Sequence, residues 1–246
     1  MGMKMKALAV CGLISISAAA AAEPVAGISG NLGDELFYNY VEAYYTHAYL
    51  GGSNGRVFAD QTYGGGFSVF LADPIYLIAN YDSKEFRFTD SSTTPPQKIS
   101  FNAQHTTAGL GVHLPVWYAT DLFANVTFER ELDHQRTTAG GVLVPAGTGT
   151  LDSDGLGYEG GVRSFVSNFA EISISYKHQD LRDKRPDATG HKEKFTDNRA
   201  IFGAVVPVYR LLSLFARAEI GRNHDESGNK TDIENYILGA RLNFRL

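Results

Sequence analysis

Histidine beside a carboxylate is the arrangement in this sequence that comes closest to catalytic chemistry. Asp133 precedes His134, and His224 precedes Asp225. Each pair could join a general base to an acid that orients it. A metal site would instead need several histidines and carboxylates close together.

Neither possibility is supported by a recognisable motif. The sequence holds seven histidines but no HExxH, no GxSxG and no closely spaced group of ligands. All of them except His113 fall in or beside long polar connections: His47, His105, His134, His178, His191 and His224. We interpret these six as ordinary polar loop residues, and we predict that the chain is not an enzyme and needs no metal or other cofactor.

Charged residues also recur at alternate positions between apolar ones. In residues 170–178, Glu171 and Lys177 share one face of a strand, and Ile172 and Ile174 share the other. The same register assigns seven acids and six bases to one polar face: Glu42, Asp82, Lys84, Glu129, Glu131, Glu159, Arg163, Glu171, Lys177, Arg217, Glu219, Arg241 and Arg245. Because the two signs nearly balance, we expect these groups to pair across a narrow interior rather than form a ring of one sign that selects ions.

These positions belong to segments with a period of two, which is the signal of a half-buried strand. We count ten such segments, and eight is the alternative count. They lie at about 37–49, 63–72, 75–88, 104–115, 122–132, 156–166, 170–178, 198–208, 212–221 and 233–246. Residues 198–208 are apolar on both faces and fit the pattern least well.

The connections between the segments alternate in length. Short links are expected at 72–74, 117–121, 167–169 and 209–211, and long polar ones at 50–62, 89–103, 133–155, 179–197 and 223–232. This alternation indicates an even number of up-and-down strands with both termini at the short-turn end.

The N-terminus predicts export. Lys4 and Lys6 precede an apolar run and then a row of alanines, which is the layout of a cleavable signal peptide over residues 1–22. Residues 23–36 are expected to form a periplasmic lead-in. The single cysteine, Cys11, lies in the signal peptide, so the mature chain would contain no disulfide.

Two architectures could use such strands, a soluble sandwich and a membrane barrel. Strands of about eleven residues, tilted near 40°, would cross the ~25 Å apolar band of an outer membrane. The chain also ends on a strand, which would have to close against the first because lipid tolerates no open sheet edge. We therefore predict an all-β fold, an antiparallel up-and-down transmembrane β-barrel over residues 37–246.

Aromatic residues support the barrel. Tyr45, Tyr49 and Tyr63 lie toward the long connections, and four others lie at short turns: Trp117, Tyr118, Phe169 and Tyr209. Two rings of aromatic side chains at the two membrane surfaces would have this distribution.

The last strand, YILGARLNFRL, resembles the C-terminal strand of small outer-membrane β-barrel proteins of Gram-negative bacteria, in the OmpA-like or porin-like superfamily. The resemblance implies that its alternate residues form the assembly signal read by the barrel-insertion machinery: Tyr236, Leu238, Leu242, Phe244 and Leu246. The family commonly ends in Phe, whereas this chain ends in Leu246. The opening FYNYVEAYY and GGGFSVFLADPIYLIANYD also resemble a first hairpin of that group.

The resemblance identifies an architecture, and the function is left between three classes. We favour a structural or surface-interaction role with a paired, narrow lumen, since small barrels are filled by side chains. The alternatives are a narrow porin and an outer-membrane enzyme. Glycines at inward positions would leave some room in the lumen or help strands to coil: Gly64, Gly66, Gly109, Gly111, Gly157, Gly161, Gly203 and Gly239.

Charge distribution bears on the partners. The net charge is −5 and no basic stripe is present, which argues against nucleic acid. The expected partners are outer-membrane lipid and lipopolysaccharide. Phosphates of lipopolysaccharide could contact the bases of one loop, although its interleaved acids favour a merely solvated loop: Arg182, Lys184, Arg185, Lys192 and Lys194.

Overall fold

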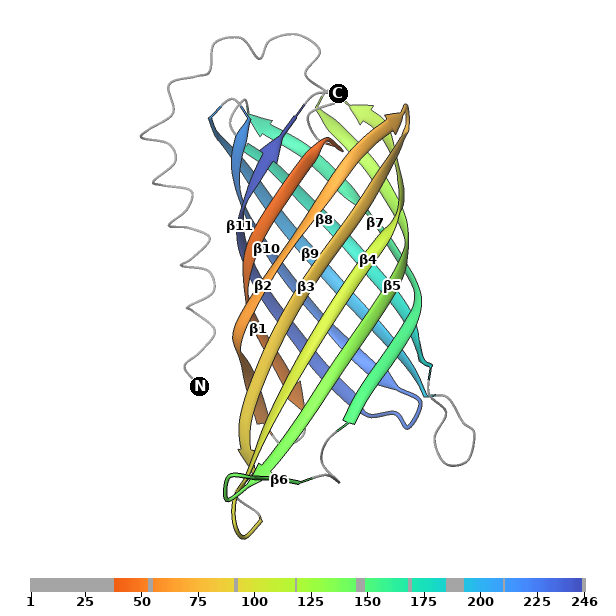
Figure 1. The fold of residues 1–246 in the computed structure, drawn as a ribbon. Coiled ribbons are helices and arrows are strands. Elements are labelled where there is room, and N and C mark those ends of the chain that lie inside the picture. Colours follow the sequence, from red (N-terminus) through yellow and green to blue (C-terminus); the bar gives the residue numbers. More distant parts are fainter. Residues whose placement is uncertain are drawn as a thin grey trace, which may run out of the picture.

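In the computed structural model the chain forms a closed antiparallel β-barrel (Figure 1). The structure describes residues 38–52, 55–90, 93–117, 119–144, 149–167, 170–184, 193–209 and 211–244. The predicted signal peptide, the predicted lead-in, Arg245 and Leu246 lie outside these ranges. No helix in the described part is long and apolar enough to cross a membrane.

Ten strands make the barrel wall, as the period-two segments predict, and a two-residue strand, β6, lies beyond it. The bounds are β1 Tyr40–Gly52, β2 Gly55–Ala72, β3 Ile75–Asp90, β4 Gln97–Trp117, β5 Thr120–Ala139, β6 Val142–Leu143, β7 Gly149–Ser167, β8 Ala170–Asp183, β9 Lys194–Tyr209, β10 Leu212–Asp225 and β11 Lys230–Asn243.

The barrel closes between its first and last strands. β1 pairs with β11 from Tyr40 opposite Asn243 to Gly51 opposite Asp232. β4 pairs with β5 over its whole length, and each remaining wall strand pairs with its neighbours in the chain. No strand edge of the wall is therefore left open, which is the condition for placing a sheet in lipid.

The strands are longer than the alternation predicts. β4 and β5 remain paired out to Gln97 and Ala139, and β8 continues to Asp183. The expected long connections at 50–62, 89–103 and 133–155 are thus largely strand, and β8 and β9 also extend into 179–197, so this part of the prediction was wrong. Both faces of these outer portions can be polar in water, so the apolar alternation stops before the backbone pairing does.

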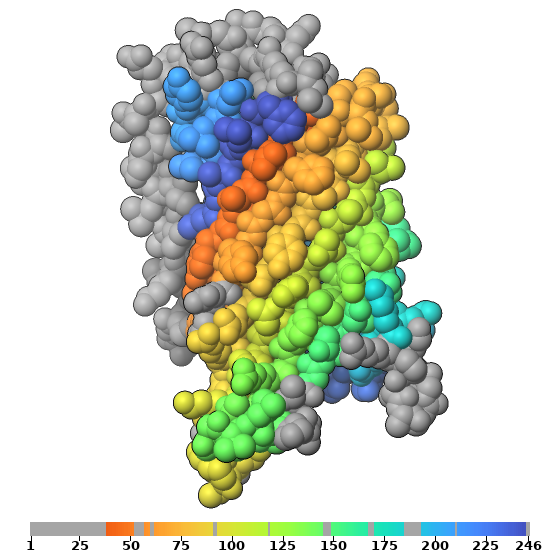
Figure 2. All heavy atoms as spheres, viewed as in Figure 1, coloured from red at the N-terminus to blue at the C-terminus, as the bar shows by residue number. Residues whose placement is uncertain are grey.

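Side chains on the outer wall are apolar. Val126, Ile174, Leu214 and Leu238 are each more than half exposed. Figure 2 shows the outer face over β2 to β5, where the side chains form continuous oblique bands along the strands. Such a surface is unfavourable in water and favourable against hydrocarbon chains.

Aromatic residues lie near both ends of this surface. Trp117 and Tyr209, beside two of the short turns, are 82% and 70% exposed. Tyr45 and Tyr63 are opposite each other on β1 and β2 and are also exposed. Tyr118 and Phe169 lie outside the described residues.

Candidate functional site: a charge network across the barrel interior

The polar face of each wall strand points inward. Of the thirteen charged residues assigned to that face from the sequence, the structure places all except Arg245 in the interior or lining its cavities. These twelve side chains come from seven strands that the register brings together around one axis: β1, β3, β5, β7, β8, β10 and β11.

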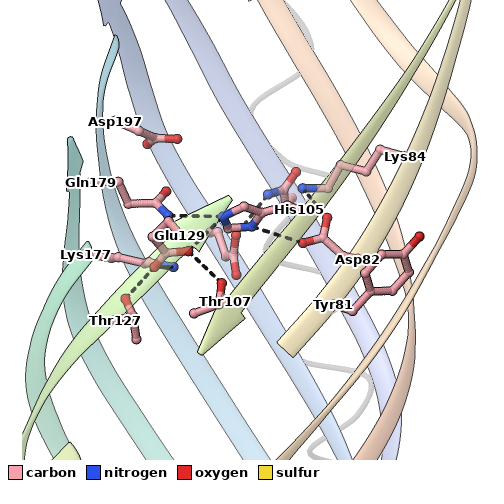
Figure 3. A network of polar contacts seen from close by, with 12 residues as sticks. Tyr81, Asp82, Lys84, His105, Thr107, Thr127, Glu129, Lys177, Gln179 and Asp197 are labelled. Atoms are coloured by element: carbon pink, nitrogen blue, oxygen red, sulfur yellow. Dashed lines mark hydrogen bonds and ion pairs between the residues drawn. The ribbon is translucent and has the colours of Figure 1, made fainter. Parts of the chain in front are cut away.

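Glu129 of β5 is the centre of the largest group (Figure 3). Its side chain is fully buried. Oε2 accepts hydrogen bonds from Thr107 Oγ1 at 2.6 Å and His105 Nε2 at 2.8 Å. Oε1 accepts from Thr127 Oγ1 at 2.5 Å and Lys177 Nζ at 3.0 Å. Four donors thus replace the water that this carboxylate loses, which is the condition for burying a charge.

His105 joins this group to a second one. Its Nδ1 lies 3.4 Å from Asp82 Oδ2, and Asp82 also pairs with Lys84 at 3.0 Å. Donation from both ring nitrogens requires the imidazolium form. The interpretation of His105 as an ordinary polar loop residue was wrong. It lies in β4, inside the predicted segment 104–115, and the register sets it between Asp82 of β3 and Glu131 of β5.

Most of the other interior charges also lie in pairs or small groups. Glu42 lies 3.0 Å from Arg241 and 3.5 Å from Arg217. Arg163 contacts Glu171 at 3.1 Å, and Arg199 contacts both Asp197 and Glu219. Glu159 accepts hydrogen bonds from Ser175 and Asn125.

The network separates two cavities. One, of about 130 Å³, lies toward the short turns and is lined by Tyr38, Arg163 and Lys177. The other, of about 250 Å³, lies toward the long hairpins and is lined by His105 and Asp133. Glu129 contacts both Lys177 and His105 and is itself closed to solvent, so ionic contacts occupy the path from one cavity to the other.

Comparisons with known proteins agree with this architecture. No protein-family model and no curated protein matches the chain. Among solved structures, the translocator domain of the autotransporter NalP from Neisseria meningitidis matches with a TM-score of 0.51 and 14% identity, covering 97% of each chain.

Two further similar structures have lower scores. The outer-membrane protease OmpT from Escherichia coli matches at a TM-score of 0.43 and 11% identity, over 84% of this chain and 94% of that one. Neisserial surface protein A matches at 0.38 and 13%, over 83% and 96%.

The closed wall, its apolar exterior and the likeness to the NalP domain are decisive for the fold. The chain has the fold of the outer-membrane β-barrel proteins. At these identities the likeness extends to the fold and leaves the activity open.

The histidine–acid pairs considered from the sequence are not assembled in this β-barrel. Asp133 is buried, whereas His134, the next residue of β5, is exposed on the opposite face. His224 and Asp225 are likewise consecutive in β10, so their side chains diverge. In the described ranges no group of three or more His, Cys, Asp or Glu residues is placed to hold a metal ion.

Several inward glycines accommodate neighbouring side chains of the barrel. A Cβ on Gly111 would meet the Tyr76 ring and Asn125, and one on Gly239 would meet the Phe215 ring. A Cβ on Gly157 would meet Glu129 and Thr127. Of the two alternatives left by the sequence, these three glycines do not leave open space in the lumen, because side chains of adjacent strands lie over them.

The proposed assembly residues of β11 lie mostly on the outer face of the barrel. Leu238 and Leu242 are each 54% exposed. Tyr236 packs edge-on against Tyr49 across the β1–β11 seam, and the Phe244 amide donates to the Asn39 carbonyl. Leu246 is beyond the described residues.

Sequence reasoning missed several interior groups. Asp197 and Arg199 fell at the edge of a segment with weak alternation, Asp121 and Asp133 were assigned to connections, and His113 was not paired with anything. His113 is buried against Tyr38, with ring centroids 4.5 Å apart. Extending the period of two into the polar connections would have found Asp133 and Asp197, since both continue the inward register.

Proposed function

We infer that the protein is an integral outer-membrane component with a structural or surface-interaction role, and that its lumen is closed to solutes. The observation that carries this proposal is the fully buried Glu129 of β5, which links Lys177 of β8 to His105 of β4. A closed lumen follows from the free energy needed to separate Glu129 from Lys177 and His105.

Opening a path through the interior would leave charges without partners. Breaking a buried ion pair by removing one member costs about 3–5 kcal/mol. Glu129 has four donors, so a solute passing through would have to displace several charge-assisted hydrogen bonds at once. A closed lumen is the lower-energy state.

The surface role is supported by the hairpins that continue beyond the apolar wall. β4 and β5 run on together past Phe128, and exposed polar side chains such as His134 and Arg136 follow. These outer ends of β4 and β5, together with β6, reach well past the rest of the barrel (Figure 1). Polar strands held rigidly away from the wall are suited to contact with other molecules.

The proposal includes three partners. Outer-membrane acyl chains would contact the apolar wall, lipopolysaccharide the outer rim, and the barrel-insertion machinery β11. Not every base suggested for lipopolysaccharide is available, however. Lys184 pairs with Asp152 and Asp154, and Lys194 lies 3.6 Å from Glu226. Arg182 is exposed, and Arg185 and Lys192 lie outside the described residues.

A narrow porin is the second candidate, because both cavities have polar linings. Single-channel current recording from the refolded protein in planar bilayers distinguishes a closed lumen from a porin. A closed lumen predicts no discrete current steps from preparations that run as a folded, heat-modifiable band on gels. Wild-type steps whose size changes in Lys177→Gln would establish conduction through the network and overturn the proposal.

A further inference from the structure

The cavity toward the long hairpins has features that the closed lumen does not require. Its volume is about 250 Å³, close to the lower end of the roughly 300–1,000 Å³ typical of small-molecule sites. Its lining reaches Asp225 and Asn229 at the β10–β11 turn, so it faces the outer end of the barrel. A small molecule could occupy it without crossing the network.

Asp133 is the unusual residue of this cavity. Its side chain belongs to a residue that is only 6% exposed, and its Oδ1 is buried without a hydrogen-bond partner. Glu131, two residues earlier on the same strand, lines the same cavity. A buried carboxylate that lacks a donor carries an unfavourable desolvation cost. A cationic ligand would remove that cost.

The basic residues of the lining do not fill this role, because other acids already hold them. Lys84 pairs with Asp82 at 3.0 Å, Arg199 contacts Asp197 and Glu219, and His105 contacts Asp82 and Glu129. Glu131 and Asp133 are acids of the lining that no base among the described residues holds. Burial and the neighbouring Glu131 raise the pKa of Asp133 to about 8, so a bound cation would take the place of the proton that Asp133 otherwise keeps.

Aromatic side chains lie next to these carboxylates. Asp133 is opposite Ala103 in the β4–β5 ladder, two residues from Phe101, and the rings of Phe101 and Phe86 have centroids 6.2 Å apart. Phe195 also lines the cavity. Carboxylates beside aromatic rings are the combination that binds organic cations, since the rings attract the positive charge and pack against the apolar part.

We propose that this cavity binds a small organic ammonium ion, with the cation paired to Asp133 and Glu131 and its apolar portion against Phe86 and Phe101. An organic cation fits better than a metal ion, because no group of three or more His, Cys, Asp or Glu residues in the described ranges is arranged as a metal site. The site goes beyond the proposed structural role and does not depend on whether the lumen conducts.

Calorimetric titration of the full-length protein, refolded in detergent micelles, tests the proposal. The probe is phenethylammonium, and the uncharged comparison is 2-phenylethanol, which has the same ring and chain. We expect saturable binding of the ammonium and at least roughly tenfold weaker binding of the alcohol, the scale of one charge-assisted contact. Asp133→Asn should weaken ammonium binding by a similar factor.

A matched control is Glu85→Gln, which removes a carboxylate paired with Arg87 outside the cavity and should leave binding unchanged. Equal binding of the ammonium and the alcohol, unchanged affinity in folded Asp133→Asn, or no binding at all would overturn the proposal. Stoichiometric Mg²⁺ binding that excludes phenethylammonium would also overturn it, in favour of an inorganic ion site. Should Asp133→Asn fail to fold, Glu131→Gln replaces it in the comparison.

Discussion

Single buried charges dominate the energetics of the interior. Glu129 is closed to solvent and receives two hydroxyl donors, an imidazole and an ammonium group. Since every lone pair direction has a donor, the carboxylate has lost water without losing hydrogen bonds. Its partners depend on it in turn, because His105 and Lys177 are themselves mostly buried.

Glu129→Gln tests this dependence. The amide keeps the shape of the side chain but removes the charge and turns two acceptor sites into donors. Lys177 then loses its counterion, and His105 keeps only Asp82. We expect the free energy of unfolding to fall by about 3 kcal/mol, measured by urea titration of the refolded protein. Asp232→Asn, which breaks a pair with Arg222 at the exposed rim, should cost less than about 1 kcal/mol. Equal losses in both variants would contradict the argument.

Neighbouring strands fit together through glycine and ring pairs. Gly111 of β4 faces the Tyr76 ring of β3, and the Tyr76 hydroxyl donates to Asn125 Oδ1 of β5 at 2.6 Å. The glycine lets an aromatic residue cross its strand and reach the next one. Three adjacent strands are thereby joined inside the wall as well as along their backbones.

Gly111→Ala should disturb this arrangement, because the new Cβ would meet the Tyr76 ring and Asn125. We expect a loss of about 1–3 kcal/mol in unfolding free energy, the usual cost of overpacking. The control is Gly160→Ala in β7, where the nearest atom to the new Cβ would be the Phe123 carbonyl oxygen at 3.9 Å. Urea titration should show that only Gly111→Ala is destabilised. Similar stability of the two variants would argue against the ring packing.

The molecule as a whole has apolar residues outside and charges inside, the reverse of a soluble protein. Val126 on the wall is 53% exposed, while Glu129 three residues later is fully buried. This distribution is stable only if hydrocarbon covers the wall. The strands that extend past the wall are polar outside and mark where that covering ends.

Two exposed valines test where the lipid lies. Val126→Arg would place a charge against acyl chains, and we expect it to destabilise the protein in phospholipid bilayers by roughly 2–4 kcal/mol. Val142→Arg is the control, since Val142 is 71% exposed but lies in β6, beyond the wall. Its unfolding free energy should stay within about 0.5 kcal/mol of wild type. Tolerance of both substitutions would be inconsistent with a membrane-embedded wall.

The alternation of apolar and polar residues was enough to predict the barrel, the ten wall strands and the faces of residues such as Glu171, Lys177 and Arg241. Those features follow from a local rule, the two-residue period of a strand, so they can be read along the chain. The positions of the short turns could also be predicted, because apolar segments stop there abruptly. The outer strand portions were missed because polar residues on both faces hide the period.

Pairing between distant residues was decided by the tertiary structure alone. His105 meets Asp82 and Glu129 only because the register of β3, β4 and β5 brings them to one level, and Lys177 of β8 reaches Glu129 of β5 past the intervening β7. The unpartnered oxygen of Asp133 and the rings that cover the glycines are equally invisible in the sequence. The residues of a strand determine which face of the sheet each side chain occupies. The residues that a side chain then contacts depend on the register of the neighbouring strands and on how the barrel closes.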